Sequence, residues 1–252
     1  MLLAPVSYAV TAALPARQGV VLRYKFKAGQ VHRSAMDINA QMKMTMGAKA
    51  QPMPINMEMK MTMTQKVQTV ASDGTATLLD TVDSQTGTAN GQPIPETPAL
   101  KKPIIQKMTR RGTIVGKPSA GGAALPMVGM NPVQMSQLVA LPAGSVHVGS
   151  SWSSDSGMGS VTNKIVSING PIAVISSDGN IDMGKAMSGM GGMFKSMKMS
   201  GTMQMHMVWR FNAAAGYPAG MTGNIQYQMQ MSAGQQGAMN MAGKMKMSLT
   251  SL

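Results

Sequence analysis

The chain has 252 residues, enough for one large β domain or two small ones with a real hydrophobic core. It contains 31 methionines, only 4% aromatic residues and no cysteine, which excludes disulfides, thiolate metal sites, thiol nucleophiles and lipid attachment to cysteine. The formal net charge of +13 favours anionic partners, but the basic residues are scattered and few aromatics accompany them, so nucleic-acid binding is not expected.

The first eighteen residues resemble part of a secretory signal. The stretch MLLAPVSYAVTAALPA is apolar, rich in small residues and uncharged before Arg17, with plausible cleavage after Ala9, Ala12 or Ala13. Its length and two prolines make it a poor membrane span. We therefore predict an extracytoplasmic protein (periplasmic, cell-envelope or secreted). The alternative is an ordinary apolar N-terminal strand or helix.

Residues 19–118 are predicted to form a first β half, because apolar and polar residues alternate with period two. The segment 66–82 is a hairpin signal, with Asp73-Gly74 as its turn. The other predicted elements are strands at 19–30 and 36–46, a loop at 47–55, a strand within 56–65, an exposed connection at 84–103, and paired strands within 104–117 that turn at Arg111-Gly112.

Residues 119–144 are predicted to be a linker with one short helix. Asn131 is a suitable N-cap, Pro132 suits the first helical position, and Leu141-Pro142 ends the pattern.

A second β half is predicted over 145–252. Its Asn169-Gly170 and Asp178-Gly179 pairs are hairpin signals. A loop rich in glycine and methionine follows at 184–197, before strands at 198–211, 221–232 and 239–249.

The two halves share a weak internal repeat. KAGQVHRS (27–34) and HVGSSWSS (147–154) each place a glycine before a strand, and each is followed by a lysine-hydrophobic arm and a D/N-G turn. The predicted fold is therefore mainly β: a curved antiparallel sheet or partly open barrel, built from two related β halves with one short central helix.

Four segments together resemble a family of exported, β-rich bacterial proteins that have no established activity. These segments are LRYKFKAGQ, QKVQTVASDGTATL, LPAGSVHVGSSW and RFNAAAGYPAGMTGNIQYQMQM. The resemblance covers most of residues 19–250 and implies export and a β fold akin to curved-sheet lipoprotein carriers. It implies no functional residues, and this chain differs from the family in its methionine content and in having no cysteine for lipid attachment.

Eighteen methionines recur at every second position, which places each run on one face of a strand. Polar residues occupy the positions between them, as in an antiparallel sheet with one face in water. The methionine face is therefore predicted to be buried, either as an ordinary core or against an apolar guest. Methionine is soft and adaptable and suits a surface that must fit variable ligands.

We therefore interpret the chain as a non-catalytic protein that binds an apolar, lipid-like ligand or partner through this face. The candidate ligand-binding residues are Met42, Met44, Met46, Met57, Met59, Met61, Met63, Met203, Met205, Met207, Met229, Met231, Met245 and Met247.

Three alternatives remain open. The chain could be a structural cell-envelope module whose basic surface contacts an anionic membrane or cell-wall polymer. Its methionine clusters could bind Cu(I) or Ag(I), which thioethers favour, although His206 in MQMHM alternates with its neighbours and faces away from them. Exposed methionines could also scavenge oxidants.

No catalytic or cofactor motif is present. The three histidines lie far apart, Asp155, Asp178 and Asp182 lie in turn-like contexts, and GMGGMF lacks the flanking strand and helix of a nucleotide-binding loop. We expect no enzyme activity, no catalytic residue, no metal site of ordinary ligand spacing and no cofactor.

Overall fold

The computed structural model describes residues 19–47, 50–96, 102–116, 119, 140–155, 159–184, 198–232 and 238–252. Within these residues, nearly all of the regular structure is one antiparallel sheet of 12 strands, with a separate two-stranded sheet formed by β1 and β8. The strands are β1 (Val20–Val21), β2 (Val31–Met46), β3 (Met53–Val70), β4 (Ala76–Ala89), β5 (Gln92–Pro93), β6 (Ile104–Met108), β7 (Ile114–Val115), β8 (Ser145–Val146), β9 (Ser151–Asp155), β10 (Gly159–Asn169), β11 (Ile172–Asp182), β12 (Lys198–Asn212), β13 (Tyr217–Ser232) and β14 (Ala238–Ser251).

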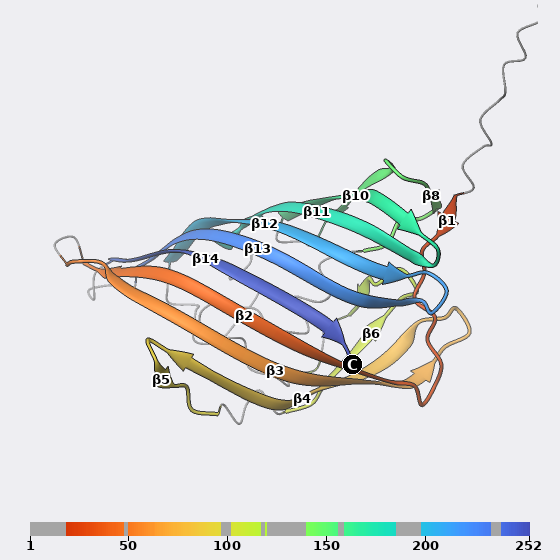
Figure 1. Cartoon of the computed structure of the whole chain (residues 1–252), viewed down its shortest axis with the longest axis horizontal. Helices are drawn as coiled ribbons and strands as arrows, with labels where there is room; N and C mark the ends of the chain where they lie inside the picture. The colour runs from red at the N-terminus through yellow and green to blue at the C-terminus, as the bar shows by residue number, and fades with distance from the viewer. Residues whose placement is uncertain are drawn as a thin grey trace, which may run out of the picture.

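The sheet is a meander whose middle joins the beginning and the end of the chain. Its strand order is β7-β6-β4-β3-β2-β14-β13-β12-β11-β10-β9, with β5 paired to β4. Strand β2 pairs with β14 from Ser34–Ser251 to Met46–Met239, so both predicted β halves contribute to one continuous sheet. The sheet curves strongly, and its two ends, β7 and β9, do not pair with each other (Figure 1). The predicted fold class, a mainly β curved antiparallel sheet, is confirmed.

Alternation explains why these segments form long strands. In β3, the side chains of Met57, Met59 and Met61 are buried, whereas Glu58 and Lys60 between them are exposed. Because successive side chains in a strand point to opposite faces, one face collects the apolar groups and the other meets water. The buried face forms one hydrophobic cluster that extends over the strands of both halves.

The two predicted repeat segments adopt the same local geometry. Gly29 and Gly149 have positive φ angles of 82° and 92°. Their N–H groups donate hydrogen bonds to the carbonyls of Val67 and Ile165, at 2.8 and 2.9 Å. Val67 and Ile165 are fully buried, and the strand register shifts immediately after each of them. This equivalence is consistent with duplication, which stays a prediction.

Most predicted turns and strands have the expected positions. Gly74, Gly112 and Gly170 all have positive φ in the turns that connect neighbouring strands, as their D/N-G or R-G signals predict. The last three predicted strands correspond to β12, β13 and β14. The predicted central helix lies almost wholly outside the described residues, as do the leader at 1–18 and nearly all of the loop at 184–197.

Four predicted elements are wrong in whole or in part. The predicted loop 47–55 contains the first residues of β3, which begins at Met53. The segment 19–30 contains only the short β1, because after Val21 the chain crosses the end of the sheet instead of joining it. Residues 84–96, predicted as an exposed connection, contain the last part of β4 and β5. Asp178-Gly179 is not a turn but lies inside β11, where the missing side chain of Gly179 leaves room for Met205 and Val161.

The segment that crosses the end of the sheet after Val21 is held in place by a close contact with Gly216. The N–H of Lys25 donates to the carbonyl of Gly216 at 3.1 Å, and Gly216 has a φ of 69°. A Cβ at this position would lie 2.6 Å from the backbone nitrogen of Lys25. The segment therefore requires glycine for both conformation and space.

We expect Gly216→Ala to lower the free energy of unfolding by about 2–4 kcal/mol, combining left-handed strain with overpacking. Gly91→Ala is the matched control, because Gly91 has a φ of 79° but nothing within 4 Å of its Cβ position. It should lose only about 1–2 kcal/mol. Urea unfolding of both variants measures the difference, and equal losses would show that the contact with Lys25 is unimportant.

Candidate ligand-binding face

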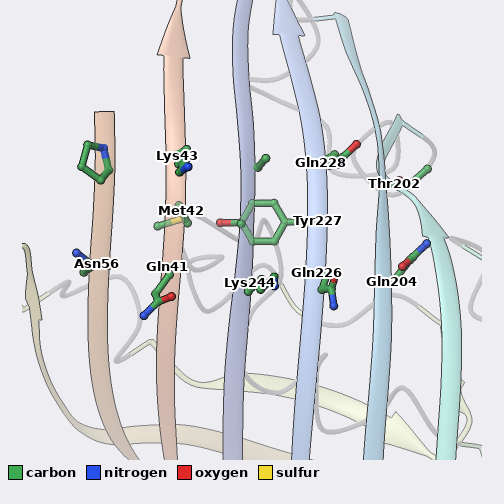
Figure 2. A pocket seen from close by; sticks show the side chains of 13 residues that line it. Gln41, Met42, Lys43, Asn56, Thr202, Gln204, Gln226, Tyr227, Gln228 and Lys244 are labelled. Carbon is green, nitrogen blue, oxygen red and sulfur yellow. The ribbon is translucent and has the colours of Figure 1, made fainter. Parts of the chain in front are cut away.

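The polar face of the sheet carries a broad hollow of about 550 Å³ over β3, β2, β14, β13 and β12 (Figure 2). Its exposed lining is rich in amides and includes Lys43 and Lys244, but no carboxylate or histidine. A second hollow of about 480 Å³ shares Lys43, Gln228 and Ala242 with it. These surfaces can donate hydrogen bonds to polar or anionic groups, and their linings contain no acid–base pair.

The opposite face carries the methionines. Of the predicted ligand-binding residues, the following have buried side chains: Met42, Met57, Met59, Met61, Met63, Met203, Met205, Met207, Met229, Met245 and Met247. Met44 and Met231 are half-buried. Met46 is 52% exposed, so the prediction that it is hidden from solvent is wrong. It is the last residue of β2.

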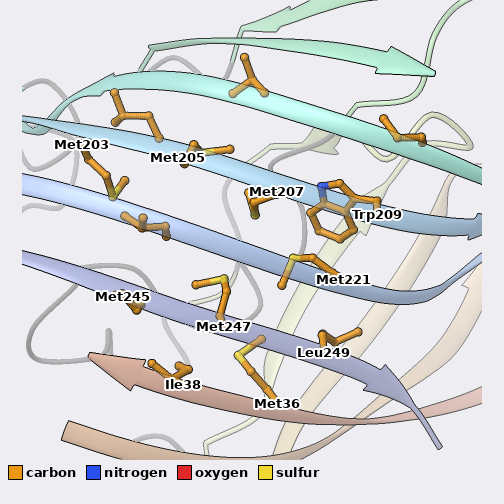
Figure 3. Close-up of a cluster of buried hydrophobic side chains, with 14 of the residues drawn as sticks. Met36, Ile38, Met203, Met205, Met207, Trp209, Met221, Met245, Met247 and Leu249 are labelled. Atoms are coloured by element: carbon orange, nitrogen blue, oxygen red, sulfur yellow. The ribbon is translucent and has the colours of Figure 1, made fainter. Parts of the chain in front are cut away.

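Strand register brings these side chains into rows across the sheet. Met61, Met36, Leu249, Met221 and Trp209 are successive cross-strand neighbours on β3, β2, β14, β13 and β12. Figure 3 shows Met36, Leu249, Met221 and Trp209 within this cluster. Directly opposed residues have Cβ atoms about 4.5–5.5 Å apart, so the stripes seen along each strand merge into a continuous apolar surface.

Several residues of this face were missed by sequence reasoning. Met36 and Met221 are 1% and 3% exposed, yet neither has a methionine two positions away in its strand. Met36 lies an even number of positions from Ile38 in the same strand, and Met221 likewise from Ile225. Their side chains are therefore on the same face as these isoleucines, and this shared parity could have predicted their burial. Met241, one of the eighteen alternating methionines, is also buried but was not among the candidate ligand-binding residues. Repetition of methionine alone was therefore too narrow a criterion, and parity within the strand is the better one.

One end of the face is partly open to solvent, and we call it the methionine end: Met44, Met46, Met53, Met231 and Met239. Met46 and Met53 are 52% and 43% exposed, and the other three are half-buried. Met46 opposes Met239, and Met239 opposes Met231 on the next strand. Thioethers here are close to one another and accessible.

The other end of the face is aromatic. The ring of Tyr24 stacks on Phe26 with centroids 5.5 Å apart and meets Phe211 edge-on at 5.4 Å. Tyr217 lies edge-on to Tyr24 at 6.3 Å and stacks on His32. Burial raises the pKa of the Tyr24 and Tyr217 hydroxyls and lowers the pKa of His32. Burial therefore favours the neutral forms of Tyr24, Tyr217 and His32 at this end of the face.

A buried carboxyl group lies beside this aromatic end. Asp80 is 4% exposed, and its Oδ1 and Oδ2 accept hydrogen bonds from the side-chain amides of Gln65 and Gln106 at 2.7 and 2.6 Å. The hydroxyl of Tyr217 donates to Oε1 of Gln65 at 2.9 Å. Burial raises the pKa of Asp80 to about 6, and the two amide donors oppose that rise. Sequence reasoning did not single out Asp80, because it lies in a plain strand pattern.

The described residues hold no cluster of three histidine, aspartate or glutamate side chains suited to a metal ion. His206 lies on the polar face, as predicted, where its Nδ1 is 2.6 Å from Oδ1 of Asp178. Asp178 and Asp182 lie in β11 and not in turns. Within the part of the chain that the structure describes, no helix has the length and hydrophobicity needed to cross a membrane.

Comparisons with known proteins concern the fold. No family model and no curated protein matches the chain. The structure is similar to a solved structure of lipovitellin, described for its lipid–protein interactions, with a TM-score of 0.52 and 13% identity. The similarity covers 90% of this chain but 25% of the lipovitellin chain, so this protein matches about a quarter of that chain's length. At this identity the likeness shows a shared curved-sheet fold.

Proposed function

We propose that this protein binds an apolar, lipid-like ligand against the methionine face, without catalysis, outside the cytoplasm. The observation that supports this most is the one-sided distribution of methionine: the buried residues of β3, β12 and β14 are largely thioethers, on a curved sheet whose two ends do not pair. The likeness to lipovitellin, a protein whose solved structure concerns lipid–protein interactions, supports the same ligand class.

The choice of methionine is informative because it is a poor residue for specifying a rigid core. Its three rotatable bonds allow repacking, whereas branched residues with defined rotamers specify one arrangement. The central rows could hold leucine or isoleucine, as they do at Ile38 and Ile225. A soft lining is advantageous when the surface must accept guests of different shapes.

The partly exposed methionine end supports an entry route. In the proposed function, Met46 and Met53 are the residues that an apolar guest would first contact from solvent. The basic polar face, with Lys43 and Lys244 exposed over the large hollow, would at the same time favour approach to an anionic membrane or cell-wall surface.

The test is ligand content and dye binding. Protein purified without detergent should carry co-purifying lipid by mass spectrometry, and the delipidated protein should bind an apolar fluorescent dye with saturation near about one per chain. Absence of both would overturn the proposal. Salt-sensitive retention on anionic vesicles without lipid uptake would favour a structural envelope module instead.

A matched pair of variants separates a ligand surface from a plain core. Met59→Leu with Met247→Leu keeps burial and should change the free energy of unfolding by less than about 1.5 kcal/mol. It should nevertheless narrow the range of apolar probes that bind, because leucine is stiffer. Lys60→Gln with Lys246→Gln, on the polar face of the same strands, should leave dye binding unchanged.

Within the part of the chain that the structure describes, a second candidate function, Cu(I) binding, is favoured by the methionine end. Met46, Met239 and Met231 are successive cross-strand neighbours and are accessible, and thioethers prefer soft Cu(I). Competition with a Cu(I) chelator tests it. Met46→Leu with Met239→Leu should abolish binding at the methionine end, and the Met59→Leu, Met247→Leu variant should retain it.

A further inference from the structure

Two segments whose charged residues are all basic touch each other at the aromatic end of the sheet. Residues 22–30 cross the end of the sheet beside β1 and β8, and residues 109–113 form the turn between β6 and β7 (Figure 1). The N–H of Tyr24 donates to the carbonyl of Arg110 at 2.8 Å, so the two segments are in contact. We call their charged residues the basic cluster: Arg23, Lys25, Lys27, Arg110 and Arg111. The fold thus gathers charges that are scattered in the sequence.

Most of the charge of the basic cluster is not compensated by carboxylates. Residues 22–30 and 109–113 contain no aspartate or glutamate, and neither do residues 140–144 and 212–216, which contact them. Asp73, on the turn between β3 and β4, interacts electrostatically with Arg110 and partly compensates one of the charges. The side chain of Arg23 is half-buried, and the other four are exposed.

Backbone carbonyls hold three of these cations in place. The side-chain donors and their acceptors are Arg23 to Pro142, Lys25 to Ala214 and Arg111 to Leu141. A carbonyl is neutral overall, so it fixes the position of a cation and leaves its charge uncompensated. The basic cluster is therefore partly ordered before any partner binds.

The polar face of the sheet also carries lysines, but carboxylates lie among them. Lys60 on β3 opposes Asp37 on β2, and Glu58 lies two positions before Lys60 on the same face. Opposite charges this close weaken each other's field at a distance. The hollow that contains Lys43 and Lys244 has no carboxylate in its lining, but it presents two charges where the basic cluster presents five. The basic cluster is therefore the stronger of these surfaces for an anionic partner.

Exposed apolar side chains flank the same crossing segment. Val21 precedes residues 22–30 and is 54% exposed, and Val31 follows them and is 48% exposed. Phe26 lies between them and is half-buried, with its ring stacked on Tyr24. At a membrane surface, basic residues meet lipid phosphates while apolar side chains enter the boundary between headgroups and tails. A soluble polyanion uses the charges but not the valines, so the combination favours a membrane.

We propose that the basic cluster, together with Val21 and Val31, docks the protein on an anionic phospholipid membrane. Because carbonyls already hold three of its cations, binding costs little side-chain freedom. The inference goes beyond the proposed function, since it concerns a surface outside the methionine rows and requires no apolar ligand.

The experiment is cosedimentation of the delipidated full chain with phosphatidylcholine vesicles that contain or lack phosphatidylglycerol. Binding should require phosphatidylglycerol and should be lost between about 0.1 and 0.5 M salt, because ions at these concentrations screen charges beyond about 10 Å or less. Equally tight binding to vesicles without phosphatidylglycerol would overturn the proposal.

A matched pair of variants assigns the binding to the cluster. Lys27→Gln with Arg110→Gln removes two exposed charges whose side chains donate no hydrogen bond to the described residues. It should lower the affinity for anionic vesicles by about tenfold or more. Lys60→Gln with Lys246→Gln removes the same net charge from the polar face and should change the affinity by less than about twofold. Equal losses in both variants would show that only the net charge matters, and the docking surface would be wrong.

A third variant separates a membrane from a soluble polyanion. Val21→Ser with Val31→Ser keeps every charge, so it should weaken binding to anionic vesicles and leave binding to soluble poly-aspartate unchanged. Thermal unfolding checks that the variant is folded. If folded protein with both serines binds vesicles as tightly as the wild type, and poly-aspartate binds as well as vesicles do, the cluster recognises polyanions and the membrane proposal is wrong.

The outcomes distinguish this inference from the proposed function. If an apolar dye binds but anionic vesicles retain no protein, the proposed function stands and the docking surface fails. If vesicles retain the protein but no dye binds and no lipid co-purifies, the docking surface stands and the proposed function fails. If Lys43→Gln with Lys244→Gln abolishes retention and Lys27→Gln with Arg110→Gln does not, the membrane contact lies at the hollow of the polar face and the inference is wrong.

Discussion

Met207→Lys is expected to destabilise the protein by at least about 4 kcal/mol, because it places an unpaired charge in the middle of the apolar face. Met207 is 0% exposed and lies on β12 between Ser177 and Gly223 of the neighbouring strands. A domain of ordinary stability has only about 5–15 kcal/mol to lose. The variant should therefore be largely unfolded or recovered as aggregate, as judged by circular dichroism and size-exclusion chromatography.

Two lysine substitutions on the same sheet are the controls. Gln204→Lys lies on the same strand but on the exposed face, and Met46→Lys lies on the methionine face at its open end. Both should change the free energy of unfolding by less than about 0.5 kcal/mol. Stable, folded Met207→Lys protein would contradict the one-sided burial on which the proposed function depends.

The second large effect is a dependence of stability on pH that comes from Asp80. Its pKa is about 6 in the folded protein, mainly because of burial, against an ordinary value of 3.8. Between these values the folded state keeps a proton that the unfolded state has released. The free energy of unfolding should therefore fall as pH rises from about 4 to about 6 and stay level above, by a total of about 3 kcal/mol.

Asp80→Asn isolates this contribution. A half-buried group nearby acts in the opposite direction: desolvation lowers the pKa of His32, so His32 adds stability as pH rises toward 6.5. Tyr24 and Tyr217 have raised pKa values and stay neutral over this range. The measurement is urea unfolding of the wild type and Asp80→Asn at several pH values from 4 to 7, and parallel curves for the two proteins would refute the assignment.

The two predictions test different parts of the same arrangement. The first concerns the central rows of methionine, which are uniformly apolar, and the second concerns the closed aromatic end, where a few polar groups are buried with them. A ligand site with this composition, mostly apolar with a small number of placed polar groups, is typical of pockets for small amphiphilic molecules.

Much of the fold could be predicted from alternation alone. The period of two in NMEMKMTMTQ identifies both the strand and its buried parity, and D-G or N-G pairs identify two of the turns. At 19–30, alternation led to a wrong prediction of a strand: Leu22 and Tyr24 are buried, but the segment is not part of the main sheet. A local pattern indicates that one side of a segment is buried, but it does not indicate which other part of the chain packs against that side.

The candidate site, like the fold, could be predicted from the sequence only in part. The methionine rows were predictable, because each row is composed of strands whose own sequences show the parity. A cavity of about 60 Å³ beside Asp80 was not, because it combines side chains from distant segments: Tyr217 donates to Gln65 across 152 positions of sequence, and Trp209 and Asp80 line the same space. Nothing in the neighbourhood of Asp80 in the sequence distinguishes it from a solvated strand residue.

By itself, the sequence determined that long strands would carry methionine on one face and polar groups on the other, because side-chain direction in a strand is a local property of the backbone. Only the tertiary structure decided that β14 would lie beside β2 and unite both halves in one sheet, that one end of the face would be open and the other closed, and that a carboxyl group would be buried at the closed end. Those features depend on the register and curvature of strands far apart in the chain, which no local period encodes.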